Sequence, residues 1–302
     1  VSLITDREVL GEYYDHKFLG TEMLFGFKVQ YNIDGAKRFY GRGPDTPKTA
    51  ESNYIEDIIQ YNAVIGYPLQ KRSPWLVSFT NRFQGYKISD GPINALPDIS
   101  AKFPGVAPYH RHQNGTIRLG LEYNTRDHSV TTSKGGYAGF FAESAQLPFG
   151  SEYDYERWLI DLRKFHPWTG TKNRQVTAAM LKFDQLDGSA PFWLMPQLGG
   201  KYIHRAYGEG RYIDKGMLTA QLEHRYSFFQ VEMAGVTTEF EVAPFTGLGV
   251  VFEEPSRMVR RYARPVYGAA IRAVARPQVV GSIDFGVGQE GLTAFMDINY
   301  SF

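Results

Sequence analysis

The sequence predicts an all-β protein, a transmembrane antiparallel β-barrel that crosses the membrane with strands. Three observations support this fold class: apolar and polar residues alternate, the alternating segments are long, and aromatic residues are abundant. The 302 residues include 20 Tyr and 21 Phe, while the hydrophobic fraction is only 43%. No run approaches the roughly 18 apolar residues that a transmembrane helix needs. A barrel fits this composition because each strand shows one apolar face to lipid and one polar face to the lumen.

Alternation is clearest in residues 21–32. One face carries Met23, Phe25, Phe27, Val29 and Tyr31, and the other carries Glu22, Lys28, Gln30 and Asn32. A period of two indicates a β-strand. The same pattern recurs at 55–62, 77–84, 116–124, 156–163, 218–228 and 279–286. A soluble sandwich also alternates, but strands of about 10–14 residues exceed the usual length of about 5–6. Arg and Glu on the polar faces suit a wet lumen better than a sandwich core.

Turn signals and polar insertions separate these segments. Turns are expected at 33–35, 71–74 and 168–170, and longer polar insertions at 36–52, 88–113 and 187–215 are expected to be extracellular loops. About 13 strand-like segments can be counted, and bacterial barrels usually have an even number, so we predict 14 strands within a range of about 12–16. Because no linker or internal repeat divides the chain, residues 1–302 are expected to form a single barrel domain.

The chain ends in an alternating segment, with Met296, Ile298, Tyr300 and Phe302 on one face. A strand that closes on an aromatic residue resembles the signal by which outer-membrane proteins are recognised for folding. We therefore expect Ile298, Tyr300 and Phe302 to form a C-terminal folding signal. Such a strand can pair with an assembly machine by adding to its sheet edge.

Residues 191–226 contain a Pro-Gln-Leu-Gly-Gly lead-in, followed by the tripeptide Arg205-Ala206-Tyr207 and a Glu-x-Arg strand. This stretch resembles the BamA/TamA superfamily, also called the bacterial surface antigen family. Its loop motif here comprises Gly199, Gly200, Ala206 and Tyr207. Residues 38–54 and 121–137 also resemble segments of this family, and the similarity runs from about residue 20 to the end of the chain.

The resemblance implies that a long loop, about 198–215, folds back into the lumen and is anchored there by an arginine. Here that residue is Arg205, and alternation places Glu223 on the polar face as its acidic partner. A guanidinium offers a bidentate fork to a carboxylate. The chain departs from the family at Ala206, which replaces a Gly, and at Gly247, which replaces a second acid. Asp284 is the expected substitute because it also lies on the lumenal face. The expected role is structural or gating.

The sequence predicts no catalytic, cofactor-binding or metal-binding residues, and hence no enzyme. Lys and Arg total 33 and Asp and Glu total 32, so a nucleic-acid partner is not expected. The absence of Cys excludes thiolate chemistry. His110 and His112 form a pair without a third ligand, and no Gly-x-Ser-x-Gly or His-Glu-x-x-His motif occurs.

Three functions remain open for this bacterial outer-membrane barrel. The first is a loop-plugged structural or partner-recruiting subunit without periplasmic domains of its own. The second is a translocation or assembly barrel whose periplasmic domains are supplied elsewhere, and the third is a passive pore or outer-membrane enzyme. The expected partners are the lipid bilayer with its lipopolysaccharide, the outer-membrane assembly machinery during folding, and other outer-membrane or periplasmic proteins.

Overall fold

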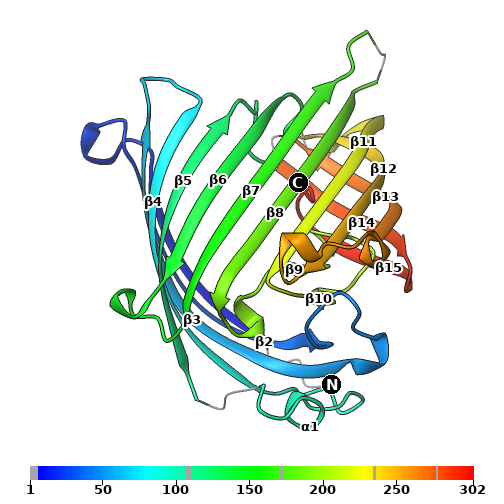
Figure 1. Ribbon diagram of the computed structural model, residues 1–302. Coiled ribbons are helices and arrows are strands. Elements are labelled where there is room, and N and C mark those ends of the chain that lie inside the picture. Colours follow the sequence, from blue (N-terminus) through cyan, green and yellow to red (C-terminus); the bar gives the residue numbers. More distant parts are fainter. Residues whose placement is uncertain (1–5, 107–109, 171–172, 234–235, 277) are drawn as a thin grey trace.

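The computed structural model describes residues 6–106, 110–170, 173–233, 236–276 and 278–302 (Figure 1). Within these residues, β-strands dominate and no helix is both long and apolar enough to cross a membrane. The strands are β1 (Arg7–Asp15), β2 (Leu24–Phe39), β3 (Ser52–Pro68), β4 (Trp75–Asp90), β5 (His112–Asn124), β6 (Gly135–Ala145), β7 (Asp154–Pro167), β8 (Gln175–Ser189), β9 (Gln197–Leu198), β10 (Tyr212–Ile213), β11 (Gly216–Met233), β12 (Val236–Phe252), β13 (Arg264–Ala275), β14 (Gln278–Gly288) and β15 (Gly291–Asp297).

In the part of the chain that the structure describes, helical structure is confined to short segments between strands. They are α1 (Ile99–Lys102) and the 3-10 turns η1 (Phe18–Gly20), η2 (Lys48–Ala50), η3 (Leu147–Phe149), η4 (Phe192–Leu194), η5 (Pro255–Arg257) and η6 (Arg260–Tyr262).

One antiparallel sheet of 13 strands accounts for most of the described residues. Its order follows the chain, β1 to β8 and then β11 to β15. The short strands β9 and β10 form a separate two-stranded sheet. The sheet curls round into a barrel (Figure 1). Thirteen strands lie within the predicted range, and among the described residues no ladder joins β1 to β15.

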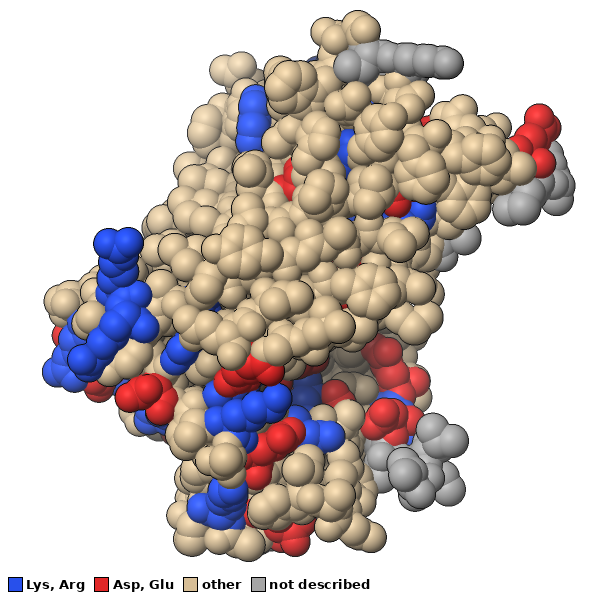
Figure 2. Space-filling view, turned by 90° about the vertical axis from the view of Figure 1, so that its right-hand side faces the viewer, with Lys and Arg blue, Asp and Glu red and all other residues tan. Residues whose placement is uncertain are grey.

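The two faces of the sheet follow the predicted alternation. Phe27, Val29 and Tyr31 on β2, and Leu119 and Leu121 on β5, are all exposed on the outer wall. An apolar surface of this kind is unusual in water and is typical of contact with lipid. Figure 2 shows a broad surface with few charged side chains, and charged side chains gathered toward its lower end, where the long loops lie. The predicted lipid-facing and lumenal faces are therefore confirmed.

The predicted turn at 33–35 is wrong, because these residues lie inside β2. The ladder between β2 and β3 shifts register between Asp34 and Lys37, which marks a β-bulge. A bulge inserts an extra residue into one strand without ending it, and Asp and Gly are tolerated there as they are in turns. The turn signal therefore indicated an irregularity within a strand that continues to Phe39.

Candidate functional site

The segment between β8 and β11 forms the predicted inward loop. Its lead-in contains η4, and the β9–β10 pair closes the loop because Leu198 and Gln197 pair with Tyr212 and Ile213. Gly199 has φ 136° and an added Cβ there would lie 2.1 Å from the carbonyl oxygen of Gly208. Gly200 has φ 85°. Glycine is therefore required at this turn, because an L side chain would be both strained and blocked.

Arg205 lies at the tip of this loop and is fully buried. Its Nη1 donates to Glu223 Oε2 on β11 at 2.7 Å and to Asp284 Oδ2 on β14 at 2.9 Å. The guanidinium carbon also lies 3.7 Å from the ring centroid of Phe245 on β12. The structure thus brings together the three residues that the sequence placed at this site, and it adds an aromatic contact that the sequence did not indicate.

Glu223 is the centre of a larger cluster of buried charges. Its carboxylate accepts hydrogen bonds from Arg205, from Arg225 Nε at 2.8 Å, and from both terminal nitrogens of Arg272 at 2.9 Å. Arg272 also donates to Glu241 at 3.1 Å. With Asp284, the cluster has three arginines and three carboxylates, so its formal charges cancel. Each ion would be costly to bury alone, and the mutual pairing offsets that cost.

Two arginines of the cluster had no predicted role at this site. Arg225 and Arg272 are 2% and 1% exposed. Their positions on the inner face follow from the same alternation that places Glu223, and Arg225 is also the arginine of the Glu-x-Arg strand, but the resemblance implied an anchoring role for Arg205 alone. Arg272 could have been found by continuing the period of two along β13, where Ile271 is exposed on the outer wall and Arg272 points inward.

The backbone of the loop packs directly against the wall. At Gly286 on β14, an added Cβ would lie 1.8 Å from the carbonyl oxygen of Arg205. Next to this contact, the carbonyl of Ala206 accepts a hydrogen bond from Thr293 Oγ1 on β15 at 3.1 Å. The Tyr207 hydroxyl accepts from the backbone N–H of Gln289 at 3.0 Å. The motif residues after Arg205 therefore hold the loop against β14 and β15.

His204 is buried beside Arg205 and lies between the loop and β13. Its Nε2 donates to the carbonyl oxygen of Arg264 at 2.7 Å, and its ring stacks on Tyr207 at 5.4 Å. Its Nδ1 is buried with no hydrogen-bond partner among the described residues. The pKa of His204 is lowered from 6.5 to about 4, mainly by burial; the hydrogen bond to the Arg264 carbonyl opposes this shift, and the nearby charge of Arg205 adds to it. The imidazole is therefore neutral at physiological pH.

The C-terminal segment departs from the predicted strand. β15 ends at Asp297, and Ile298 is 69% exposed, whereas Tyr300 and Phe302 turn inward and are 6% and 8% exposed. The Tyr300 hydroxyl donates to Glu241 Oε2 at 3.2 Å, and Arg225 Nη2 donates to the carbonyl oxygen of Phe302 at 2.8 Å. The expectation that Ile298, Tyr300 and Phe302 share one strand face is therefore wrong. Charged groups inside the barrel offer the terminal residues hydrogen bonds and cation–π contacts that the lipid face lacks.

The pair His110 and His112 lies in a different environment. Their rings are 4.1 Å apart, and His112 Nδ1 lies 2.6 Å from Glu152 Oε2. Within the described residues, no group of three His, Cys, Asp or Glu side chains is placed to hold a metal ion.

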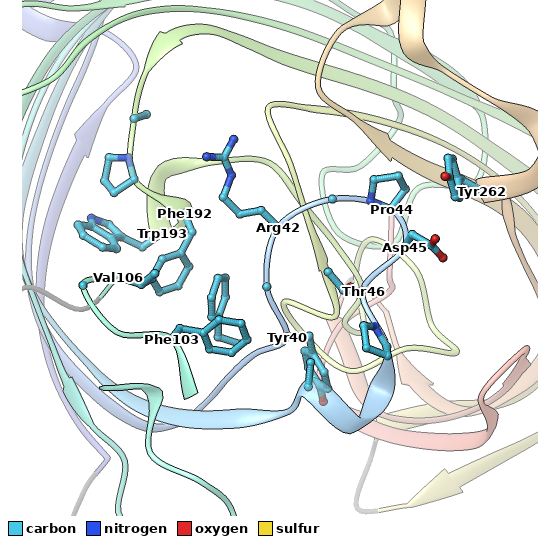
Figure 3. Close-up of a pocket in the computed structure, with 18 of the residues that line it drawn as sticks. Tyr40, Arg42, Pro44, Asp45, Thr46, Phe103, Val106, Phe192, Trp193 and Tyr262 are labelled. Atoms are coloured by element: carbon cyan, nitrogen blue, oxygen red, sulfur yellow. The ribbon is translucent and has the colours of Figure 1, made fainter. Parts of the chain in front are cut away.

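A cavity of about 900 Å³ opens among the long loops (Figure 3). Aromatic side chains line much of it, including Tyr40, Phe103, Phe192 and Trp193, and Arg42 is the cationic side chain among them. A mostly apolar cavity with a few polar groups is the usual form of a binding pocket. This cavity is separate from the Arg205 cluster.

The comparisons with known proteins agree with this architecture. A family model described as the Omp85 superfamily domain matches residues 5–287. The chain belongs to the Omp85 superfamily. Among solved structures, it is similar to BamA from Haemophilus ducreyi lacking POTRA domains 1–3, with a TM-score of 0.65 and 14% sequence identity. That alignment covers 97% of this chain and 61% of the BamA chain, so this chain spans less than two thirds of that structure. No curated protein matches the sequence.

Family and fold together place this Omp85 barrel in the bacterial outer membrane. Its exposed apolar wall contacts the lipids there, and the predicted membership in the BamA/TamA group of barrels is confirmed.

Proposed function

We propose that this Omp85 barrel is plugged by its own loop and acts as a structural or partner-recruiting subunit of the outer membrane. The observation that carries the proposal is the fully buried Arg205, which is held by Glu223 and Asp284. A loop anchored by a buried ion pair is costly to withdraw, because one set of charges would be left unpaired in the wall. The proposal includes no catalytic step, cofactor or metal ion.

The proposed role in recruiting a partner rests on the aromatic cavity of about 900 Å³ among the long loops. In the expected topology these loops face the outside of the cell. Aromatic side chains and arginine are the residue types that most often carry binding energy at protein interfaces. A partner that inserts an apolar side chain into this cavity would use this surface.

Conductance in planar bilayers tests the plug. The intact chain is expected to give small or no steady current, and Arg205→Ala to raise it by releasing the loop. Arg257→Ala is the matched control, because Arg257 lies in an exposed loop and its side chain is 63% exposed. Large steady currents from the intact chain would contradict the proposal.

Trypsin access gives a second readout of the same loop. Lys201 and Arg211 flank Arg205 in the sequence, so release of the loop should expose two cleavage sites that do not depend on Arg205 itself. Faster cleavage there is expected for Arg205→Ala and not for Arg257→Ala. Equal cleavage rates in the intact chain and in both variants would show that Arg205 does not anchor the loop.

A second candidate function, protein translocation or outer-membrane assembly, is favoured by one observation. β15 has a ladder with β14 on one side and no ladder on its other side among the described residues. A strand edge of this kind can pair with an incoming strand. A photocrosslinker at Met296 on β15 should then capture unfolded barrel proteins, while one at Phe140 on β6, which is paired on both sides, should not. Equal capture at both positions would speak against this function.

A further inference from the structure

A second group of inward-facing charges lies on the opposite part of the wall, on β4 to β8. It borders a polar cavity of about 240 Å³, which is roughly eight times the volume that one water molecule occupies in the liquid. The charged residues that line the cavity are Arg82, Arg157, Lys182 and Asp184. The other side of the cavity is formed by the lead-in of the inward loop, including Trp193 and Leu194.

The carboxylates near this cavity are already used by arginines. Both oxygens of Glu143 on β6 accept hydrogen bonds from Arg82 Nη2 at 2.8 Å, and the same carboxylate also accepts from Arg118 Nε at 2.9 Å. Asp184 accepts a bidentate pair from Arg157 at 2.8 and 2.7 Å. Glu143 therefore accepts hydrogen bonds from two arginines, and both oxygens of Asp184 accept from a third.

Lys182 is left without a direct hydrogen bond or ion pair in this arrangement, although the charges of Asp184 and Asp161 act on it. It makes no hydrogen bond or ion pair with any residue that the structure describes, although it lies on the same face of β8 as Asp184. Asp161, which is opposite Lys182 in the β7–β8 ladder, is held by Arg163 at 2.9 and 2.7 Å. The Lys182 ammonium therefore retains three N–H donors for a group that enters the cavity.

The formal charge of the cavity is positive, in contrast to the neutral Arg205 cluster. The lining has three cations and one carboxylate, a net of +2. Adding the neighbouring Arg118 and Glu143 leaves this sum unchanged, because their charges cancel. A stable arrangement with two uncompensated charges on an inner wall calls for a counterion.

We propose that this cavity binds a small divalent oxyanion of the phosphate type, with Lys182, Arg82 and Arg157 as its cationic contacts. Arginine and lysine are the usual protein ligands of phosphate, and the net charge of +2 matches a hydrogen phosphate dianion. The three cations come from β4, β7 and β8, and all of them line the same cavity. A tetrahedral anion has four oxygens, so separate oxygens can accept from each of the three cations.

The anion comes from solution and not from a lipid headgroup. The three cations lie on the inner face of the wall, whereas Trp158 and Leu181 on the same strands are exposed on the outer face toward lipid. A headgroup would have to cross the sheet to reach them.

Titration of the full chain with inorganic phosphate tests the site. The protein is held in maltoside micelles in buffer free of phosphate and sulfate, and binding is followed by calorimetry. Saturable binding of one phosphate per chain is expected, and Lys182→Gln should weaken it by about tenfold, the effect of one charge-assisted contact. Lys182→Arg should retain binding, because it keeps the charge.

Lys164→Gln is the matched control. Lys164 lies on β7 and is exposed on the outer face, so this variant should bind phosphate as the unmodified chain does. Heat-modifiable migration on gels verifies that each variant is folded. Absence of saturable binding, or equal loss in both Gln variants, would overturn the proposal.

The source of the anion is tested in nanodiscs. Phosphate affinity should be the same in nanodiscs of phosphatidylcholine and of phosphatidylglycerol. A weaker affinity in phosphatidylglycerol would show that an anionic lipid headgroup competes for the site, and would overturn the assignment to a soluble anion.

Discussion

Two regions of the inner wall connect their buried polar side chains by different means. On β2 to β5, a row of uncharged amides crosses the strands, with Gln30, Gln60, Gln84 and Asn114 opposite one another in register. Each donates to its neighbour, at 2.7 Å from Gln60 to Gln30, 2.8 Å from Gln84 to Gln60 and 3.2 Å from Asn114 to Gln84. On β11 to β14, buried ions connect the strands instead, and one of these ions, Arg205, comes from the inward loop.

The difference shows what each region can hold in place. The amide row joins strands that the sheet already pairs, so it adds to a ladder whose geometry is fixed. The ion cluster joins Arg205 to Glu223, 18 residues away, and to Asp284, 79 residues away. Only the second device fixes a loop, and it does so with groups that are costly to leave unpaired. Four changes test this contrast.

The largest effect is expected at Glu223. Glu223→Gln removes the negative charge that three buried arginines share, so the loss should be about 3–5 kcal/mol of unfolding free energy. Guanidinium unfolding in micelles, followed by Trp fluorescence, measures it. Glu122→Gln is the control, because Glu122 accepts from the Tyr137 hydroxyl at 2.9 Å and an amide can replace it there. Similar losses in both variants would mean that the ion cluster is no more important than an ordinary hydrogen bond.

The next effect is expected from pH through His204. An unfolded histidine binds its proton near pH 6.5, but the buried imidazole binds it only near pH 4. The unfolded chain therefore holds more protons between these values, so stability is complete above pH 6.5 and falls as the pH is lowered to 4, by about 3 kcal/mol at most. Unfolding at pH 7 and pH 5 measures the loss. His204→Gln keeps a donor for the carbonyl of Arg264 and should remove this part of the dependence of unfolding free energy on pH. If that dependence is unchanged in His204→Gln, groups other than His204 cause it.

A smaller effect is expected where the loop backbone meets the wall. Gly286→Ala places a methyl group against the carbonyl of Arg205 and should cost about 2 kcal/mol, with faster trypsin cleavage at Lys201. Gly281→Ala on the same strand has nothing within 4 Å of the added Cβ and is the matched control. If the two variants were cleaved equally fast, the loop would not be held by this contact.

The smallest effect is expected in the amide row. Gln84→Met removes hydrogen bonds to Gln60, Tyr86 and Asn114 but leaves neutral groups behind, so the loss should be roughly 1–2 kcal/mol without any change in trypsin access to the loop. Gln113→Met, at an exposed position of β5, is the control for the introduced side chain. Increased loop cleavage in Gln84→Met would contradict the separation of the two regions.

Much of the fold could be predicted because alternation is a local property. A strand places successive side chains on opposite faces, so the outward position of Phe27 and the inward position of Glu223 follow from residue parity alone. Gly199 and Gly200 were expected in the loop only from the family resemblance, and the structure shows that they form its tight turn. The proximity of Arg205 to Glu223 was expected from a family resemblance, and alternation supplied Asp284 as a further acid.

The remaining features depend on contacts between segments that are distant in the sequence. The bulge at Asp34 looks like a turn in the sequence because Asp and Gly serve both purposes, and only pairing with β3 shows that the strand continues. Gly286 leaves space for the carbonyl of Arg205, and this need for a glycine is visible only when β14 and the loop are seen side by side.

The C-terminal residues illustrate which features the sequence determines and which depend on the tertiary structure. The sequence determined which residues of each strand face lipid and which face the lumen, because the period of two is set by the backbone. It could not determine that Tyr300 and Phe302 leave that pattern. Their inward turn depends on Glu241, Arg225 and Arg272, which the curled sheet brings together beneath the terminal residues. The tertiary structure decided their position because buried charges stabilise the terminus more than continued alternation does.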